Sequence, residues 1–406
     1  MKKLFALLNA VFISSGFGFG QTPGCTDQLA INYNATATQN DGSCQYPSSS
    51  TGTLFSQILD TTLSEISGIV QNNGHVYGIC DQADNRVFEI DTLNGSILTQ
   101  YSCGTLTNQN WEEIARDSIY FYLGDFGNNY NGNRTDLRIY RIEKSSLFAG
   151  NPQVDTIDFA YSTQTNFNPT GLNSTDYDCE AFVVTPDSIF LFTKQWLSNG
   201  SVVFALPNSP GYHSAIPVDS FPVQGLITGA TRIEGAQAVV LCGYSNLLQP
   251  FLYLLYDFPG NRFFSGNKRK VGLNLPFHQI ESISTTDGIR YHLANEFFTN
   301  QFLTVPQQYH VIELDSYLSG YLYPLSTGTP ESTKYTPHLP FPNPTSGILR
   351  IDNDSQLIHR RYKIINQQGI TAGEGIFNGE IDMSSWTNGV YLLQFDRLPP
   401  YRIIRQ

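Results

Sequence analysis

A strand–turn–strand unit recurs five times between residues 54 and 325, and this repeat constrains the fold more than any other feature of the chain. In each unit a short apolar segment is followed by a turn and by a second apolar segment that ends in a polar residue. Successive units start roughly 50 to 65 residues apart, with room for one or two further amphipathic strands between them. The first segments begin at Glu65, Glu112, Asp178, Leu226 and Gln279.

Four short strands per repeat are typical of a propeller blade, so we predict an all-β chain with a five-bladed β-propeller over residues 54–325. Leu54 to Asp60 are expected to lie beside Val311 to Leu314 and close the ring, which leaves no long strand edge exposed. A six-bladed ring is the alternative, because residues 142–178 could hold a degenerate unit. Small residues near the start of each first strand suit the crowded axis of a propeller: Gly68, Ala115, Ala181, Gly229 with Ala230, and Ser282.

Acidic residues open or close many of these predicted strands. A propeller places equivalent positions around one axis, so we expect these acids and Lys194 to converge on one mouth of the channel. Clustered carboxylates must raise their pKa values, bind a cation or gain hydrogen-bond donors. The residues are Glu65, Asp81, Glu113, Asp125, Asp178, Glu180, Glu281 and Glu296.

Three interpretations of this acid cluster stay open. In the structural one, the acids accept backbone hydrogen bonds or pair with Arg134, Arg138 and Lys194, and so hold neighbouring blades together. In the second they bind Ca²⁺, a hard cation that prefers oxygen ligands. In the third a bound metal polarises a phosphoryl oxygen or activates water. The catalytic candidates are Glu113, Glu180 and Glu281.

The loop from Asp125 to Arg134 is dense in side-chain oxygens. It lacks the regular spacing of an EF-hand, and its Asn-Gly pairs are also ordinary turn chemistry. A calcium site and a simple turn are therefore both open. The metal candidates are Asp125, Asn128, Asn129, Glu180 and Glu281.

Other classes of function find no support. The net charge is −12 without a basic run, so nucleic acid is an unfavourable partner. The chain has neither a His-Glu-x-x-His zinc motif, nor a Gly-x-Ser-x-Gly elbow, nor a phosphate-binding Gly-Lys-Ser or Gly-Lys-Thr loop. Trp111 and Trp196 could form an aromatic platform for a glycan, although packing between blades is the commoner use of such side chains.

The six cysteines fall into two groups. Cys25 and Cys44 bracket a segment too small to bury a core of its own, and we expect them to form a disulfide within a module at residues 21–47. The other four lie in or near predicted strands, where buried thiols and disulfides are both open. They are Cys80, Cys103, Cys179 and Cys242.

The ends and junctions of the chain carry further signals. Residues 1–20 read as a signal peptide, with Lys2 and Lys3 before a short apolar run, and are too short for a membrane span. Polar segments at 48–53 and 326–336 are predicted linkers. Residues 337–406 read as short strands with glycine turns, and we expect a small immunoglobulin-like β-sandwich there.

The C-terminal pattern also resembles a known family. The order of motifs from Pro340 to Gly347, Ile381 to Trp386 and Asn388 to Leu393 resembles the type A sorting domain of proteins exported by the type IX secretion system of Bacteroidetes. The resemblance implies passage through the periplasm, a secreted or cell-surface location, the type IX machinery as a partner, and removal of the domain on export. The motif residues are Pro342, Asn343, Pro344, Gly347, Gly389 and Tyr391.

The repeat region has a resemblance of its own. Asn110 to Ala115, Gly124 to Asn129 and Asp178 to Ala181 resemble segments of uncharacterised secreted propellers of Bacteroidetes and, more distantly, of esterase-like, phytase-related propellers. The first implies a secreted protein, and the extracellular ligand that we expect at the acid-lined end of the channel could be a glycan, a phosphate ester or a protein. The second implies a metal-dependent phosphoric ester hydrolase. A structural or adhesion role in the cell envelope is the third reading.

Overall fold

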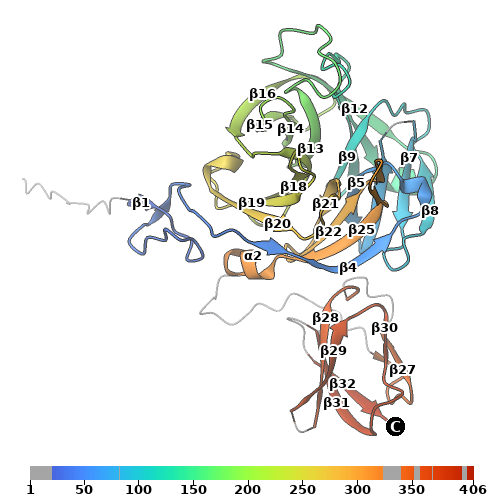
Figure 1. Ribbon diagram of the computed structural model, residues 1–406. Helices are drawn as coiled ribbons and strands as arrows, with labels where there is room; N and C mark the ends of the chain where they lie inside the picture. The colour runs from blue at the N-terminus through green and yellow to red at the C-terminus, as the bar shows by residue number, and fades with distance from the viewer. Residues whose placement is uncertain (1–20, 82, 323–339, 352–356, 368, 396–399) are drawn as a thin grey trace, which may run out of the picture.

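A computed structural model describes residues 21–81, 83–322, 340–351, 357–367, 369–395 and 400–406. The predicted signal peptide and the predicted linker at 326–336 lie outside the described residues. Among the described residues, the regular structure of the repeat region is almost all short strands, most of which pair antiparallel (Figure 1).

The strands follow one another in groups of four that pair antiparallel, and each group corresponds to one predicted unit. The first group is β5 (Ile66–Asn72), β6 (His75–Cys80), β7 (Arg86–Ile90) and β8 (Ile97–Ser102). The second is β9 (Trp111–Arg116), β10 (Tyr120–Asp125), β11 (Arg138–Glu143) and β12 (Val154–Tyr161). The third is β13 (Asp178–Val184), β14 (Ser188–Lys194), β15 (Ser201–Pro207) and β16 (Gly211–Phe221).

Two further groups complete the series. The fourth is β17 (Leu226–Arg232), β18 (Ala238–Tyr244), β19 (Pro250–Tyr256) and β20 (Asn267–Leu273). The fifth is β21 (Ile280–Ser284), β22 (Arg290–Asn295), β25 (Gln308–Glu313) and the early strand β4 (Thr53–Ile58). A hairpin of β23 (Phe298–Thr299) and β24 (Thr304–Val305) branches from this last group. There are also two short 3₁₀ turns: η1 (Thr61–Leu63) follows β4, and η2 (Phe263–Ser265) precedes β20.

The first strands of the groups form a closed cycle of contacts: β5 with β9, β9 with β13, β13 with β17, β17 with β21, and β21 with β5. This arrangement is propeller-like, with the first strand of each sheet innermost. The predicted closure is confirmed, because β4 pairs with β25 and so joins the start of the region to its end. One feature was not predicted: β12 pairs in parallel with β16, which merges the second and third sheets at their outer edge.

The segment in which a degenerate sixth unit was possible does not form a four-stranded sheet of its own. Residues 143–177 contain the short helix α1 (Lys144–Phe148) and β12, which is the outer strand of the second sheet. The rest of this segment forms a loop without strands among its residues.

Every inner strand is interrupted by a bulge at the same place. In each, one residue is skipped in the pairing with the second strand, for example between Ile66 and Gly68, which pair with Cys80 and Ile79. A bulge re-aims the side chain of its extra residue. The skipped residues are Ser67, Glu112, Glu180, Thr228 and Glu281, and we call them the bulge residues.

The bulge register corrects one predicted position. The residue after each bulge is Gly68, Glu113, Ala181, Gly229 or Ser282, so the equivalent of the small residues in the second unit is Glu113 rather than Ala115. The crowding itself is as expected. A methyl group built on Gly68 would lie 2.7 Å from the backbone nitrogen of Ile114, in the neighbouring sheet.

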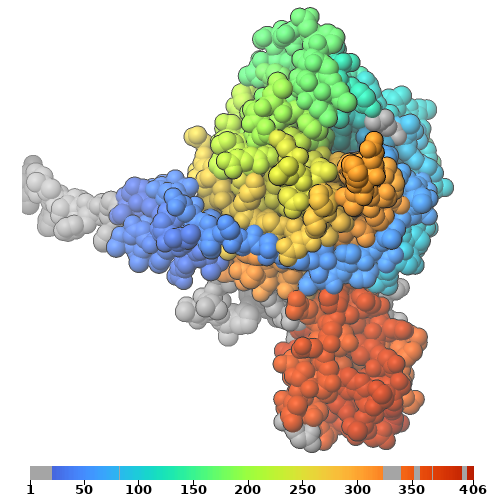
Figure 2. Space-filling view, viewed as in Figure 1, coloured from blue at the N-terminus to red at the C-terminus, as the bar shows by residue number. Residues whose placement is uncertain are grey.

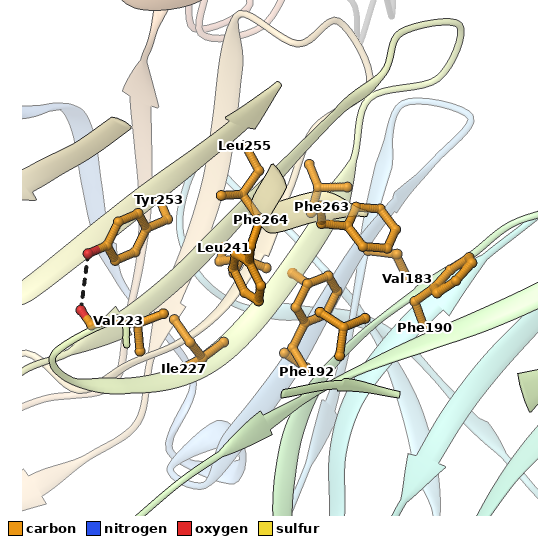
Figure 3. Close-up of a cluster of buried hydrophobic side chains, with 14 of the residues drawn as sticks. Val183, Phe190, Phe192, Val223, Ile227, Leu241, Tyr253, Leu255, Phe263 and Phe264 are labelled. Atoms are coloured by element: carbon orange, nitrogen blue, oxygen red, sulfur yellow. Dashed lines mark hydrogen bonds between the residues drawn. The ribbon is translucent and has the colours of Figure 1, made fainter. Parts of the chain in front are cut away.

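Apolar side chains fill the spaces between neighbouring sheets. Between the third and fourth sheets, Phe192 and Phe263 pack with their ring centroids 5.5 Å apart, close to Ile227 and Leu241 (Figure 3). At the edge of this cluster the Tyr253 hydroxyl donates to the carbonyl of Val223 at 3.1 Å. Burial of this kind is the main stabilising term in a ring of sheets.

The N-terminal module lies against the side of the fourth sheet (Figure 2). The predicted disulfide between Cys25 and Cys44 is present, beside the two-residue strands β1 (Pro23–Gly24) and β2 (Gln39–Asn40). Asp27 accepts hydrogen bonds from the hydroxyls of Tyr46 and Tyr256, which ties the module to β19. The segment predicted as the first linker contains a strand, β3 (Ser50–Thr51), that pairs with the open edge of β20.

The C-terminal region forms a separate lobe after α2 (Asp315–Leu322) (Figures 1 and 2). Two sheets enclose one apolar core that includes Leu349, Ile364 and Phe395. One sheet has the order β26 (Pro340–Phe341), β27 (Ile348–Ile351), β30 (Glu380–Asp382). The other has the order β29 (Thr371–Ile376), β28 (Arg361–Asn366), β31 (Gly389–Phe395), β32 (Tyr401–Arg405).

Candidate functional site

The starts of the inner strands and the ends of the second strands meet at one end of the ring, because the two strands of each pair run antiparallel. Most of the predicted acids lie at this end. The bulge residues of the first and fourth sheets take no part in the acid cluster: the Ser67 and Thr228 hydroxyls donate to the carbonyls of Trp111 and Ile280 on the next inner strand. The other three bulge residues are glutamates.

Lys194 lies at the centre of the acid cluster. Its ammonium group, at the end of β14, donates to the carboxylate of Glu180, and both side chains are only 4% exposed. It also donates to the Tyr244 hydroxyl at 3.2 Å, and it lies 4.8 Å from the ring centroid of Trp196. Removal of two charges from water is expensive unless they are paired. Lys194 therefore anchors the cluster.

The carboxyl groups around Lys194 are held mainly in their neutral form. Burial raises the pKa of Glu180 to about 7 and that of Glu296 to about 8, and Lys194 opposes both shifts. Burial also raises the pKa values of Glu112 and Glu281 well above the usual range, with Glu180 adding to each rise. One ammonium group cannot balance four carboxylates, so most of them keep a proton at neutral pH.

Neutral side chains hold two of these carboxyl groups in place. Gln279 donates to Glu296 at 2.9 Å, and Asn110 donates to Glu112 at 2.6 Å. Asn110 is buried, and its side-chain oxygen has no hydrogen-bond partner among the described residues. A buried unsatisfied acceptor costs about 1–3 kcal/mol, so a ligand that donates a hydrogen bond here would be favoured.

Two predicted residues lie at the rim of the cluster. Glu65 is exposed and Asp81 is partly exposed, and the Asp81 amide donates to the Glu65 carbonyl at 2.9 Å. Both contribute negative charge that raises the pKa of Glu296. Their positions leave the solvent side of the cluster negatively charged.

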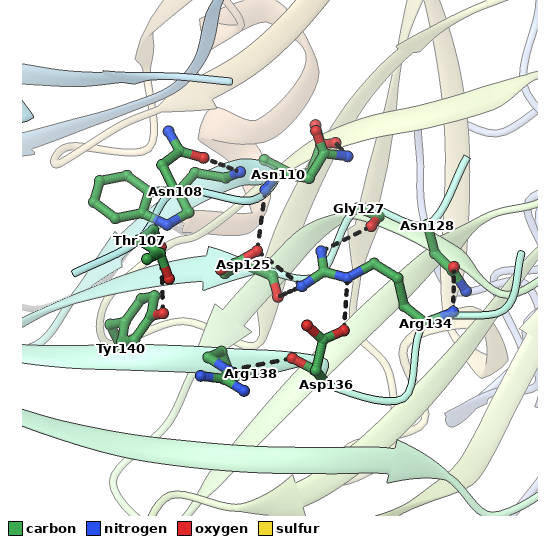
Figure 4. A network of polar contacts seen from close by, with 12 residues as sticks. Thr107, Asn108, Asn110, Asp125, Gly127, Asn128, Arg134, Asp136, Arg138 and Tyr140 are labelled. Carbon is green, nitrogen blue, oxygen red and sulfur yellow. Dashed lines mark hydrogen bonds and ion pairs between the residues drawn. The ribbon is translucent and has the colours of Figure 1, made fainter. Parts of the chain in front are cut away.

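Asp125 and Asp178 belong to a second network, between the second and third sheets. Asp125 accepts from the Arg134 guanidinium at 3.0 Å and from the Asn110 amide at 3.1 Å (Figure 4). Asp178 accepts from the Asn128 amide at 2.6 Å and from the Trp196 indole at 2.7 Å. These bonds fix the loop that follows β10, as the structural interpretation of the acids required.

The predicted metal ligands are divided between these two networks. Asn128 uses its side-chain oxygen to accept from the Arg134 amide, and the buried side-chain oxygen of Asn129 has no partner among the described residues. Glu180 and Glu281 interact with Lys194 instead. Within the described part of the chain, no three His, Cys, Asp or Glu side chains are grouped closely enough to hold a metal ion.

Glu113 lies apart from the cluster, one residue beyond its bulge. Its carboxyl group crosses the axis and accepts from the Ala230 amide at 3.2 Å as well as from the Ile114 amide at 3.0 Å. Burial raises its pKa well above the usual range. Glu113 thus occupies the crowded axial position where the other sheets have glycine, alanine or serine.

Sequence reasoning did not single out several members of the cluster. Glu112 was passed over in favour of its neighbour Glu113, and Tyr244, Gln279 and Asn110 were not considered as site residues. The pairing register shows that Glu112 is equivalent to Glu180 and Glu281. The small residues could not have shown this, because the one in the second unit, Ala115, stands three residues after Glu112. The amide and hydroxyl partners carry no such signal.

The four remaining cysteines are free thiols and all are buried. Burial raises the pKa values of Cys80 and Cys103 to about 12, so these thiols are not activated as nucleophiles.

The predicted motif residues of the C-terminal lobe bond within it. The Asn343 side chain accepts from the Ile404 amide at 2.9 Å and donates to the Arg402 carbonyl at 2.7 Å. The Tyr391 hydroxyl donates to the Thr387 carbonyl at 2.8 Å. The motif therefore fastens the first turn of the lobe to its last strand.

Comparison with known families identifies this lobe. Residues 340–398 match the secretion system C-terminal sorting domain family. The match indicates export by type IX secretion and interaction with that machinery, which fits a secreted or cell-surface protein. No curated protein matches the chain.

Solved structures with a similar course of the chain are remote. The WD40 repeats of RRP9 are 9% identical at a TM-score of 0.37, over 65% of this chain and 99% of that one. The PQQ-bound aldose sugar dehydrogenase of Streptomyces coelicolor is also 9% identical, with a TM-score of 0.37, over 64% of this chain and 98% of that one. The propeller-like arrangement rests instead on the strand order and inner-strand contacts of this chain. Its described helices are all too short to cross a membrane.

Proposed function

We propose that this chain is an exported five-bladed propeller of a Bacteroidetes cell envelope, and that it binds a ligand at the acid-lined end of its channel. The closed cycle of five inner strands supports this blade count. The sorting domain is removed once it has directed export.

The observation that carries the proposal is the group of three bulge glutamates around Lys194. Bulges at equivalent places put Glu112, Glu180 and Glu281 at the same end of the channel, where each interacts electrostatically with Lys194, although the fold needs no carboxylate there. The first and fourth sheets form the same bulge with Ser67 and Thr228. Buried carboxyl groups with raised pKa values cluster at functional sites.

The chemistry of the cluster favours a ligand that brings positive charge or several hydrogen-bond donors. A cation would convert neutral carboxyl groups into carboxylates and release their protons. Ca²⁺ is the simplest such ligand. Because no three acids of the described residues are grouped closely enough to hold it as they stand, its binding would draw the bulge glutamates together, with the rim acids Glu65 and Asp81 supplying further oxygens. A glycan would offer hydroxyl donors to Asn110 and to the carboxyl groups.

Thermal unfolding of residues 21–406, the chain without its predicted signal peptide but with the C-terminal lobe still attached, tests the proposal in EDTA and across a Ca²⁺ titration. Binding to the folded state alone should stabilise it by about 2.7 kcal/mol at a hundredfold excess over Kd. The double variant Glu180→Gln/Glu281→Gln should lose this response, whereas Glu374→Gln, an exposed glutamate of the C-terminal lobe, should keep it. A panel of glycans and a charged peptide library, read by the same melt, covers organic ligands.

The outcomes separate the alternatives. Saturable stabilisation by Ca²⁺ that depends on the glutamates would justify assays for a metal-dependent phosphoric ester hydrolase of the phytase-like type. Stabilisation by a glycan or peptide without turnover would support a binding protein. If every ligand leaves both wild type and double variant unchanged, the binding proposal fails, and the cluster serves only a structural or adhesion propeller.

A further inference from the structure

The channel has a second mouth at the carboxyl ends of the inner strands. A cavity of about 450 Å³ opens there and is lined by all five inner strands. Each strand contributes a residue at or next to its end: Gln71, Arg116, Val184, Arg232 and Ser284. Glu180 lies four residues before Val184, which is about 13 Å along a strand. This basal cavity, as we name it, is therefore distinct from the acid cluster.

Two arginines line the basal cavity, and they differ in how their guanidinium groups are used. Arg116 donates to the Gln71 carbonyl at 2.5 Å and pairs with Glu234 at 3.4 Å. The guanidinium group of Arg232, at the end of β17, makes no hydrogen bond or ion pair to any residue in the described part of the chain, although the residue is only partly exposed. A guanidinium group offers five donors in a fixed plane.

The carboxylates of the cavity do not neutralise Arg232. Asp117 uses one oxygen to accept from the amides of Ile119 and Tyr120, and the other to accept from the Tyr122 hydroxyl. Glu234 is 69% exposed and turned to Arg116. Behind the wall, the buried ammonium group of Lys144 donates to the Asp117 carbonyl at 3.0 Å, which adds positive charge.

Neutral donors complete the cavity. The hydroxyls of Ser118 and Thr231 line it and make no hydrogen bond to a described residue. One unpaired guanidinium group and two unpaired hydroxyls from the lining of one cavity suit an oxyanion, which accepts several hydrogen bonds at once and pairs with arginine in a bidentate manner. The character of this mouth is opposite to that of the acid-lined mouth, in a chain whose net charge is −12.

We propose that the basal cavity binds the anionic group of a small ligand, a carboxylate or a phosphate, with Arg232 as the bidentate donor and Ser118 and Thr231 as secondary donors. Arg116 lies beside the site and keeps its own pair with Glu234. This site is independent of the ligand proposed for the acid cluster.

Titration calorimetry of the full exported chain with inorganic phosphate and, separately, with succinate tests the proposal. At least one anion should bind saturably, and the one that binds identifies the chemistry. Arg232→Gln should weaken that binding at least tenfold, and Arg232→Lys, which keeps the charge but loses the planar fork, should weaken it less. Arg262→Gln removes an exposed arginine that does not line the cavity and should leave binding unchanged.

Two further measurements keep the result interpretable. Ser118→Ala changes a surface hydroxyl only, so it should weaken binding severalfold with the fold intact, even if Arg232→Gln unfolds the chain. The double variant Glu180→Gln/Glu281→Gln should bind the anion as wild type does, since it alters only the opposite mouth. The proposal is overturned if neither anion binds at millimolar concentration, or if Arg262→Gln weakens binding as much as Arg232→Gln.

Discussion

At the scale of single residues, the bulge position has two uses in one molecule. Where it holds a hydroxyl, as in Ser67 and Thr228, the side chain bonds to the next inner strand and ties two sheets together. Where it holds a glutamate, the longer side chain does not make this bond and instead interacts with Lys194. The same backbone irregularity therefore serves either the ring or the site, depending on one side chain.

The raised pKa values make stability depend on pH. A glutamate ordinarily has a pKa of 4.5, and burial raises that of Glu296 to about 8. Below pH 4.5 the group is protonated in both folded and unfolded chains, and no stability is lost. Between pH 4.5 and 8 the unfolded chain releases the proton first, so the free energy of unfolding should fall as pH rises, by at most about 5 kcal/mol for this group.

Urea unfolding of wild type and Glu296→Gln at pH 5, 6.5 and 8 measures this effect. The amide cannot ionise and can still accept from Gln279, so the variant should lose less stability than wild type across this range and be the more stable chain at pH 8. Glu374→Gln is the control, because that side chain is exposed. Parallel pH profiles for wild type and Glu296→Gln would contradict the raised pKa.

The acid cluster could be predicted in outline but not in its members. Repeating strand units imply that acids at equivalent positions converge, and Glu180, Glu281 and Glu296 do interact around Lys194. Whether Glu112 or Glu113 joins the cluster depends on which residue forms the bulge. The alternation of apolar and polar residues along a strand does not show the position of a bulge. The separation of Asp125 from the cluster depends on Arg134, nine residues away along a loop.

At the scale of elements, the inner strands approach one another closely where their bulges end. The Cβ of an alanine at Gly68 would lie 2.7 Å from the Ile114 nitrogen and 3.0 Å from the Glu113 Cα, both of them backbone atoms that cannot turn aside. We therefore expect Gly68→Ala to push β5 away from β9 and to cost about 1–3 kcal/mol in the free energy of unfolding.

Gly272→Ala is the matched control, since Gly272 also lies inside a strand but its Cβ would meet the Ser50 Cβ at 3.5 Å and the Ser49 carbonyl oxygen at 3.6 Å, both ordinary van der Waals distances. Chemical unfolding should show that this variant stays within about 0.5 kcal/mol of wild type. Equal effects of the two alanines would mean that the inner strands are not in close contact at Gly68.

The course of the strands was largely readable from the sequence, and the pairing of their edges was not. Apolar runs and turn residues marked the four strands of each group and the closing role of β4. The pairing of β12 with β16, and of β3 with β20, joins backbone edges whose hydrogen bonds depend little on side chains. Edge pairing of this kind leaves no pattern that a sequence could show.

At the scale of the whole molecule, the C-terminal lobe touches the propeller through a small set of contacts. Arg290, on β22, donates to the His359 carbonyl at 3.1 Å and pairs with Glu313 at 3.3 Å. His359 also stacks on Phe55, with ring centroids 4.6 Å apart. Arg290 keeps Glu313 as a partner when the lobe is absent, so the propeller does not need the lobe to satisfy its charges.

Deletion of residues 340–406 should therefore separate export from folding. Without the sorting domain the type IX machinery has nothing to recognise, and the chain should accumulate in the periplasm while its thermal midpoint stays close to that of the full chain. Immunoblots of periplasmic, cell-surface and medium fractions measure the first effect, and circular dichroism melts measure the second.

As the reciprocal control, residues 340–406 fused to a periplasmic carrier protein should bring that carrier to the surface or the medium. Surface delivery of the truncated chain would contradict the assignment of the lobe as the export signal. Loss of its folded state would show that the propeller needs the contacts between Arg290 and the lobe for its stability.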